Sequence, residues 1–349
     1  MKKLILLSAI VLLTACKNDK SGNENRPATE SEGQVVNVYT HRHYEADQEL
    51  FRMFEEKTGI DVQVVNANAD ELIQKMSMEG EQSPADVLIT VDAGRLTRAK
   101  EQGLLQPIES EILENAIPSH LKDEDNEWFG LTKRARIIAY VKDRVNPEEL
   151  STYEDLASDK WNDKVLIRSS GNIYNQSLLA SLIAHNGEEE ATTWAEGMVE
   201  NMARTPRGGD RDQVKAIVAG EGDLAVVNSY YIGKMLNSSD PEEAATAEKV
   251  RLFFPNQEGR GTHINVSGAG VAKHAPNKEN AIRFIEFLAS EEAQEIFANS
   301  NYEYPVLEGL EPAQTLQEWG EFKEDTLNLS VLGDNNKEAV LIFDEAGWK

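Results

Sequence analysis

Segments with the period of a β-strand alternate with segments with the period of an α-helix along most of the chain. Beyond residue 34, the first apolar runs typical of strands lie at 35–39, 60–65 and 87–89, and each is followed by apolar residues at helical spacing. Strands that alternate with helices form a mainly parallel sheet with helices on its faces. The sequence therefore predicts an α/β fold.

A second series of the same kind begins near Arg136. Its expected strands and helices are, in chain order, 136–140, 165–167, 176–185, 191–204, 224–227, 265–271 and 282–288. With 349 residues the chain is long enough for two lobes, each with its own core. We expect a ligand cleft between the lobes. Lobe 1 is assigned to 35–135 and 258–310, and lobe 2 to 136–257 and 311–349.

The N-terminus has the pattern of an export signal. A positive start (Met1-Lys2-Lys3) precedes an apolar run at 4–13, and Leu13-Thr14-Ala15-Cys16 follows. This tetrapeptide resembles the bacterial lipobox, in which the cysteine is acylated; a plain secretory signal with a chance cysteine is the alternative. We expect a lipoprotein signal peptide at 1–15, a lipid anchor at Cys16, a flexible polar tether at 16–34, and a location in the cell envelope, periplasmic or on the outward membrane face.

Cysteine content and charge exclude several classes of function. Cys16 is the single cysteine, so an intrachain disulfide and a thiolate metal cluster are both impossible. The formal net charge of −26 argues against nucleic acid or an anionic membrane as a partner, because both require a basic surface. An acidic surface favours solubility but does not by itself specify a function.

Tyrosines follow three of the expected strands. Tyr44 comes after the strand at 35–39, Tyr174 lies in the polar loop 169–175 after the strand at 165–167, and Tyr230-Tyr231 follows the strand at 224–227. Ligands of open α/β sheets gather outside the carboxyl ends of the strands. We therefore expect the phenols to converge, although a Tyr-Tyr pair alone more often serves packing. Tyr39, Tyr140 and Tyr153 are assigned to packing.

Converging phenols are suited to a hard, highly charged cation. Phenolate is an anionic oxygen donor, but the pKa of free tyrosine is about 10, so the metal must displace the proton. Ferric iron can do this, whereas calcium and magnesium prefer carboxylates. Nearby cations could offset the charge of several phenolates, and the candidates are Arg42, Arg136 and Arg207. His41 and His43 could bind zinc, but two histidines make an incomplete site.

At these residues the chain resembles the ferric-ion-binding proteins of ABC iron importers, of the Fut and Fbp type. The similar segments include VYTHRHYEAD (38–47), SPADVLITVDAGRL (83–96), WFGLTKRARIIAY (128–140), IRSSGNIYNQSLLASLIA (167–184) and NYEYPVL (301–307). The resemblance implies a two-lobed periplasmic-binding-protein fold of type II with a hinged cleft.

The same resemblance implies a site and partners. It makes Tyr44, Tyr174, Tyr230 and Tyr231 ligands of transported Fe(III), with His43 as a further ligand and a synergistic anion as an alternative or addition. It also implies a monomer that docks to an ABC permease of the cytoplasmic membrane and closes about its hinge.

Other functions remain open from the residues alone. The cargo could be ferrous iron, another metal or an organic cation. A hydrolase with an unrecognised Ser-His-Asp arrangement and a purely structural surface lipoprotein are further alternatives. No nucleophile elbow, His-Glu-x-x-His motif or complete dinucleotide fingerprint occurs, so we expect a binding protein and not an enzyme.

Overall fold

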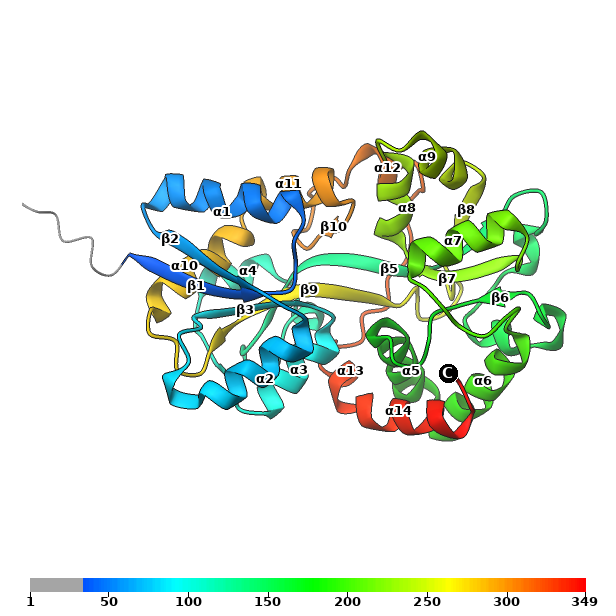
Figure 1. Cartoon of the computed structure of the whole chain (residues 1–349), viewed down its shortest axis with the longest axis horizontal. Helices are drawn as coiled ribbons and strands as arrows, with labels where there is room; N and C mark the ends of the chain where they lie inside the picture. Colours follow the sequence, from blue (N-terminus) through cyan, green and yellow to red (C-terminus); the bar gives the residue numbers. More distant parts are fainter. Residues whose placement is uncertain (1–33) are drawn as a thin grey trace, which may run out of the picture. The chain divides into compact units, whose positions relative to one another are not determined.

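One mixed β-sheet organises residues 34–349, the part of the chain that the computed structural model describes (Figure 1). Its main order is β2-β1-β3-β9-β5-β7-β6, with β10 and β8 paired to β5 and β4 paired to β9. The strands are β1 (Val35–Thr40), β2 (Asp61–Asn66), β3 (Val87–Val91), β4 (Leu105–Gln106), β5 (Phe129–Val141), β6 (Val165–Leu166), β7 (Leu224–Asn228), β8 (Val250–Phe253), β9 (Ile264–Ala272) and β10 (Tyr304–Pro305).

The centre of the sheet is antiparallel, so the prediction of a mainly parallel sheet is wrong there. β1 is parallel to β2 and β3, and β6 is parallel to β7, as strand–helix alternation predicts. β9, however, is antiparallel to both β3 and β5, and β5 is antiparallel to β7. The local pattern does not reveal this, because β9 comes late in the chain and inserts between two earlier strands.

Strand β5 belongs to both parts of the sheet. Its residues up to Ala135 pair with β9, where Ala135 lies opposite Ile264, and its residues from Arg136 onward pair with β7, where Arg136 lies opposite Asn228. Figure 1 shows β5 running from the group of β1, β3 and β9 to the group of β6, β7 and β8. The change of partner falls between residues 135 and 136. The predicted lobe boundaries themselves remain predictions.

Helices cover both faces of the sheet (Figure 1). They are α1 (Glu45–Thr58), α2 (Ala69–Glu79), α3 (Ala93–Glu101), α4 (Glu111–Ala116), α5 (Ile173–Asn186), α6 (Glu188–Asn201), α7 (Asp210–Ala219), α8 (Ser229–Leu236), α9 (Pro241–Ala247), α10 (Lys278–Leu288), α11 (Glu291–Asn301), α12 (Gln314–Gln317), α13 (Val331–Asp334) and α14 (Asn336–Glu345). Short 3-10 helices lie at Gly80–Gln82, Ser119–Leu121, Pro147–Glu149, Glu154–Ala157 and Asp159–Trp161.

Local sequence signals explain where two of these helices begin and end. Gly59 ends α1 in the left-handed region at φ 72°, where a glycine carries no steric penalty. Asn68 caps α2, since its side chain accepts a hydrogen bond from the N–H of Asp70 at 3.0 Å. Asp70 therefore lies inside the first turn of the helix.

The apolar face of α1 anchors it to the core. Leu50 and Phe54 are fully buried, and the ring of Phe54 meets that of Phe284 of α10 edge to face at 5.0 Å. Burial of side chains of this size contributes roughly 1.5–3 kcal/mol each. This packing fixes the position of the first turn of α1, which Tyr44 directly precedes.

No helix in the described part of the chain is long and apolar enough to cross a membrane. The expected signal peptide, Cys16 and nearly all of the expected tether lie outside the described residues.

Candidate metal centre

The tyrosines lie where strands give way to helices. Tyr44 is the residue immediately before α1, Tyr174 is the second residue of α5, and Tyr230 and Tyr231 are the second and third residues of α8. The prediction that Tyr174 lies in a loop is wrong. Helix α5 begins three residues earlier than predicted, because the carbonyl of Asn172 already accepts helical hydrogen bonds from the N–H groups of Asn175 and Gln176.

The structure brings these tyrosines together. The rings of Tyr230 and Tyr231 stack with centroids 4.2 Å apart. Tyr231 packs against a small apolar cluster of Val91, Ile173 and Tyr174. The Tyr44 side chain interacts with that of Tyr230, and the charge of Tyr174 acts on all three of the other phenols. Phenol groups from separate segments thus share one site.

Burial disfavours the charged form of three of these phenols. Tyr230 is 2% exposed, and burial together with Tyr174, Tyr231 and Tyr44 raises its pKa well above that of free tyrosine. Burial also raises the pKa of Tyr231, to which Tyr174 and Asp210 add, and the pKa of Tyr44, to which Glu303 adds. A cation that binds here as a phenolate complex must therefore displace protons that are held more tightly than usual.

His41 and His43 lie in different environments. His43 is exposed, its ring centroid lies 5.4 Å from that of Tyr44, and its Nδ1 lies 3.3 Å from the carbonyl oxygen of His41. If Nδ1 carries the proton, Nε2 is left with a free lone pair. Burial lowers the pKa of His41 to about 3, so that imidazole is neutral. Across residues 34–349, no group of three or more His, Cys, Asp or Glu side chains could hold a metal.

Five cationic side chains face the tyrosines. The guanidinium of Arg42 lies 5.1 Å from the ring centre of Tyr44, and the Nζ atom of Lys234 lies 3.5 Å from it. The guanidinium groups of three arginines lie near the ring centre of Tyr174, at 5.7 Å (Arg134), 5.9 Å (Arg136) and 5.7 Å (Arg168). Two of the five, Arg42 and Arg136, are the residues that the sequence selects.

The expectation for Arg207 is wrong. It is largely exposed and pairs with Glu221 at 3.1 Å, because it lies in the segment before α7 that points toward solvent. Sequence reasoning missed Arg134, Arg168 and Lys234. Strand spacing could have revealed Arg134, two residues before Arg136, and helical spacing could have revealed Lys234, four residues after Tyr230.

Buried carboxylates hold three of these cations in place. Arg42 pairs with Asp47 at 2.8 Å and with Glu303 at 3.2 Å, and Asp47 also accepts the backbone N–H of Tyr44 at 3.2 Å. Asp210 pairs with Arg136 at 2.8 Å and with Arg168 at 2.9 Å. Arg134 instead donates to the hydroxyl of Ser267 at 3.1 Å, and burial lowers the pKa of Lys234 to about 8.

The charges of this shell complement those of a loaded site. The five cations exceed by two positive charges the three carboxylates that pair with Arg42, Arg136 and Arg168. Phenolates from all four tyrosines around a trivalent ion would carry one negative charge. The surrounding field therefore favours such a complex.

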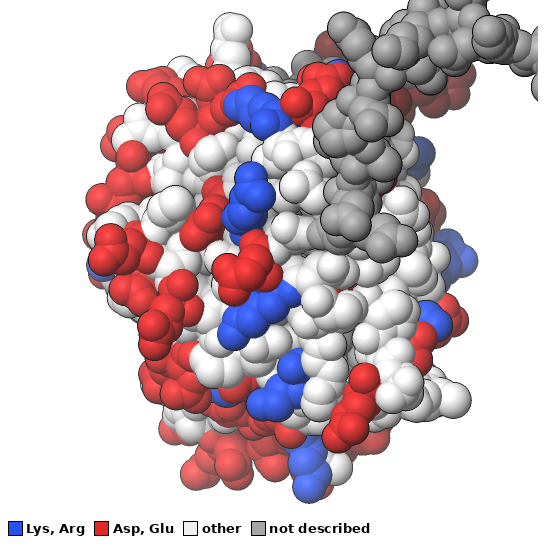
Figure 2. Space-filling model, turned by 90° about the vertical axis from the view of Figure 1, so that its left-hand side faces the viewer, with Lys and Arg blue, Asp and Glu red and all other residues white. Residues whose placement is uncertain are grey.

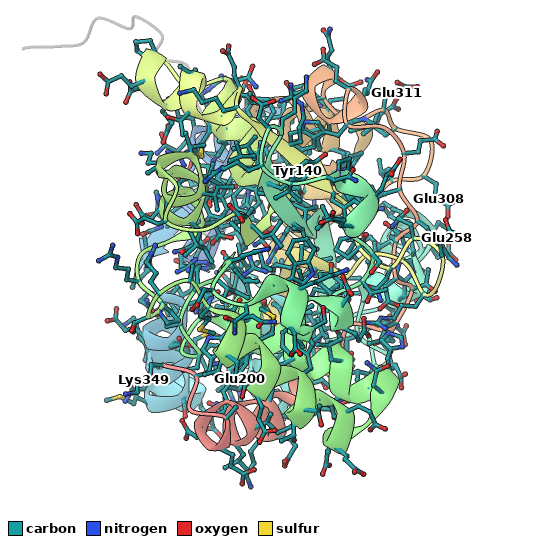
Figure 3. The ribbon with its side chains drawn as sticks, turned by 90° about the vertical axis from the view of Figure 1, so that its right-hand side faces the viewer. Tyr140, Glu200, Glu258, Glu308, Glu311 and Lys349 are labelled. Atoms are coloured by element: carbon teal, nitrogen blue, oxygen red, sulfur yellow. The ribbon has the colours of Figure 1, made fainter. Side chains whose placement is uncertain are left out.

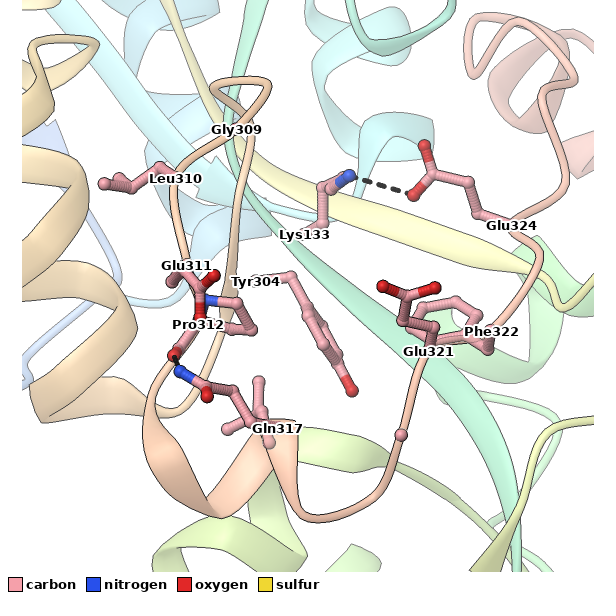
Figure 4. Close-up of a pocket in the computed structure, with 12 residues that line it drawn as sticks. Lys133, Tyr304, Gly309, Leu310, Glu311, Pro312, Gln317, Glu321, Phe322 and Glu324 are labelled. Atoms are coloured by element: carbon pink, nitrogen blue, oxygen red, sulfur yellow. Dashed lines mark hydrogen bonds and ion pairs between the residues drawn. The ribbon is translucent and has the colours of Figure 1, made fainter.

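None of the four tyrosines lines the hollow drawn in Figure 4. A hollow of about 580 Å³ lies elsewhere, between β5, β10 and the segment 309–324, and is lined by Lys133, Tyr304 and Phe322, among others (Figure 4). There Lys133 forms an ion pair with Glu324 at 2.9 Å. A cavity of about 10 Å³ beside Tyr174, room for one water molecule, is bordered by Arg134, Arg136 and Asn228. The chemistry of the donors, and not the size of a hollow, identifies the candidate site.

The remaining surface and tyrosines fit the expectations. Acidic side chains predominate over basic ones on the face in Figure 2, and the labelled Glu200, Glu258 and Glu308 are exposed at the surface in Figure 3. Tyr140 is 8% exposed on β5, and Tyr39 and Tyr153 are fully buried, as expected for packing.

The chain is similar to known proteins over most of its length. Residues 82–323 match the model of the family described as bacterial extracellular solute-binding protein. Iron uptake protein A1 of Synechocystis sp. is 54% identical over 321 residues, which cover 92% of this chain and 89% of that protein. The major ferric iron-binding protein of Neisseria gonorrhoeae is 25% identical over 320 residues, which cover 90% of this chain and 93% of that protein.

Solved structures are similar as well. The structure of the Trichodesmium protein IdiA (FutA) in complex with iron and citrate ligands has 53% identity and a TM-score of 0.88, with 90% of this chain and 100% of that chain covered. The ferric binding protein from Campylobacter jejuni has 47% identity and a TM-score of 0.86, with the same coverage of the two chains. These matches confirm the α/β solute-binding fold. The chain therefore belongs to the family of bacterial extracellular solute-binding proteins that includes iron uptake proteins A1 and A2 of Synechocystis sp..

Proposed function

We propose that this protein captures ferric iron outside the cytoplasm and delivers it to an ABC permease. The observation that carries the proposal is the meeting of Tyr44, Tyr174, Tyr230 and Tyr231 inside a shell of cations. The relatives named as iron uptake and ferric iron-binding proteins support the same cargo.

The four phenol oxygens are the proposed ligands. Burial raises the pKa values of Tyr44, Tyr230 and Tyr231, so a weakly polarising ion cannot displace their protons, whereas Fe(III) can. His43, exposed beside Tyr44, is the proposed fifth ligand through Nε2. An external anion is the alternative for that position, and the Trichodesmium structure contains citrate together with iron.

Capture would occur between two lobes. In the proposed division, Tyr44 belongs to lobe 1 and the other three tyrosines belong to lobe 2. The change of strand partner between Ala135 and Arg136 supports a boundary at that point of β5. Rotation about this region would separate Tyr44 from the other phenols and release the ion.

The protein would act as a monomer at the cell envelope. The signal peptide at 1–15, the lipid anchor at Cys16 and the tether at 16–34 would hold the binding domain near its permease. An ATPase would then drive uptake of the ion. Globomycin sensitivity of processing and radiolabelling with palmitate test the anchor, and neither would be observed for a plain secretory signal.

Colour tests the cargo and the ligands together. Phenolate-to-Fe(III) charge transfer gives a red-orange solution, so the iron-loaded mature domain should show a visible band. Tyr230→Phe combined with Tyr231→Phe should abolish this band while the circular dichroism spectrum is unchanged. The matched control is Tyr140→Phe, because Tyr140 is equally aromatic and buried but lies on β5 away from the cluster. A double variant that retains colour and affinity would refute the ligand assignment.

Two of the alternatives predict other results. A protein for ferrous iron, another metal or an organic cation would bind its cargo without the band. A purely structural lipoprotein would show no rise in melting temperature with Fe(III), whereas a tight ligand stabilises the folded state by mass action. The hydrolase alternative is excluded, because the family consists of solute-binding proteins.

A further inference from the structure

One carboxylate outside the proposed ligand set contacts the segments that carry three of the tyrosines. Asp210 is the first residue of α7, and its side chain is entirely inaccessible to solvent. Its Oδ1 accepts hydrogen bonds from Nη1 of Arg136 at 2.8 Å and from the backbone N–H of Asn228 at 2.9 Å. Its Oδ2 accepts one from Nη1 of Arg168 at 2.9 Å. Both oxygens are thus occupied by protein donors, so Asp210 is not a ligand itself.

Two of these contacts lead to Tyr174. Arg136 also donates from Nη2 to the side chain of Asn175, the neighbour of Tyr174, at 2.7 Å. Arg136 and Arg168 both lie against the ring of Tyr174. Without Asp210, these guanidinium groups would lose the carboxylate that fixes their positions.

The third contact leads to the tyrosine pair. Asn228 is the last residue of β7 and precedes Tyr230 by two positions. The hydrogen bond that this backbone N–H donates to Asp210 therefore fixes the position of the start of α8 relative to the start of α5. The three contacts together connect the first turns of both helices through a single buried side chain.

We propose that Asp210 is the positioning residue that sets the relative placement of Tyr174 and the Tyr230-Tyr231 pair. This inference rests on the proposed function, since it concerns how the same phenols reach a common ion. Metal sites in general lose affinity when the partners that orient their ligands are removed.

The charge of Asp210 and its proposed positioning role predict opposite changes in Fe(III) affinity when Asp210 is replaced by Asn. Its negative charge lies near Tyr231 and repels the phenolate form of that side chain. If Asp210 acted only through its charge, Asp210→Asn would stabilise the phenolates and tighten Fe(III) binding. If Asp210 acts by position, the same variant weakens binding, because one of the two accepting oxygens becomes an NH2 group that can only donate. The sign of the change therefore separates the two roles.

The test measures Fe(III) affinity by competition with citrate, followed through the visible band, in the full mature domain. We expect Asp210→Asn to bind about 10- to 100-fold more weakly and to shift or weaken the band. The matched control is Asp86→Asn. Asp86 is equally buried and accepts hydrogen bonds from the N–H groups of Asn37 and Asn277, on the β1–β3 side of the sheet. The Asp86→Asn variant should have a lower melting temperature but the same Fe(III) affinity and the same visible band as the wild type.

If Asp210→Asn does not fold, a second variant tests the positioning role of Asp210. Arg168→Lys keeps the positive charge but loses the planar contact with Tyr174 and the fixed geometry toward Asp210. Because the Arg168 side chain is 25% exposed, this change is tolerated more easily. It should weaken Fe(III) binding, by less than Asp210→Asn does.

The outcomes are distinguishable from failure of the proposed function. A wild-type domain with no Fe(III) band would refute the proposed function. A wild-type domain that binds Fe(III), with Asp210→Asn or Arg168→Lys variants that bind as tightly or more tightly, would overturn the positioning role alone.

Discussion

Glu303 should stabilise the folded protein through a buried ion pair with Arg42. Its side chain is 1% exposed, that of Arg42 is 3% exposed, and the two groups lie 3.2 Å apart. Glu303 also accepts hydrogen bonds from Ser267 at 3.2 Å and from Asn301 at 2.5 Å. The pair joins the NYEYP segment to the residue that precedes His43 and Tyr44, 261 positions away in sequence.

Glu303→Gln should destabilise the iron-free domain by about 3 kcal/mol. Removal of one partner of a buried ion pair costs about 3–5 kcal/mol. The lower end applies because Arg42 keeps Asp47 as a partner at 2.8 Å and glutamine keeps one acceptor oxygen. At an unfolding entropy of about 2.1 cal/mol/K per residue, such a loss lowers the melting temperature of a domain of this size by roughly 4–5 °C.

The effect should depend on pH in a defined direction. Burial raises the pKa of Glu303, but the charges of Arg42 and Arg134 and hydrogen bonds outweigh burial and lower it overall. A carboxylate with a lowered folded-state pKa contributes stability that is fully present above its unfolded pKa, about 4.3, and is lost as the pH falls through the folded value. The difference between wild type and Glu303→Gln should therefore be constant from pH 6 to 8 and shrink in acid.

Urea denaturation of the metal-free domain at several pH values measures this difference. Glu311→Gln is the matched control, because Glu311 is exposed and has no ion pair within the described chain. It should change the free energy of unfolding by less than about 0.5 kcal/mol. A Glu303→Gln variant with a loss below about 1 kcal/mol at pH 7, or a loss that grows in acid, would refute the reasoning.

Other changes should have smaller or more local effects. Gly233→Ala should lower the free energy of unfolding by about 1–3 kcal/mol and weaken Fe(III) binding, because the new Cβ would lie 2.6 Å from the Cβ of Tyr302 and α8 would have to move. Unchanged stability in urea denaturation would show that the helix adapts. Tyr153→Phe should lower the free energy of unfolding by about 1–3 kcal/mol, because the Tyr153 hydroxyl donates to the carbonyl of Arg136 at 2.5 Å and accepts from the N–H of His263 at 3.1 Å. A thermal unfolding curve equal to that of the wild type would contradict these bonds. The visible band of the iron-loaded protein should fade on acidification, since protons compete with Fe(III) for phenols whose pKa burial raises; a titration with a band independent of pH would exclude phenolate ligands.

The sequence was sufficient to predict the α/β fold and the tyrosines that meet. Strand ends are local features, so the placement of Tyr44 and of the Tyr230-Tyr231 pair directly after a strand follows from hydrophobic period, whereas the early start of α5, which includes Tyr174, was not predicted. The antiparallel placement of β9 could not be predicted in this way, because it depends on where a late segment of chain returns to the sheet.

The surroundings of the tyrosines were less predictable. Arg207 and Arg136 look alike in sequence, yet Arg136 is buried on a central strand and Arg207 is exposed. Asp210 and Glu303 carry no local signal, since their importance arises from partners that are 74 and 261 positions away. Contacts of this range are set by the tertiary fold.

Because β5 belongs to both parts of the sheet, a bend in this strand would change the electrostatic potential at Tyr174. Arg134 and Arg136 lie on either side of the point where the strand exchanges β9 for β7, and both guanidinium groups lie near the ring of Tyr174. A bend of the backbone at this point would move one guanidinium relative to the other. The electrostatic potential at that phenol would then change with the angle of the strand, so deformation of the sheet alone would alter how firmly a cation is held.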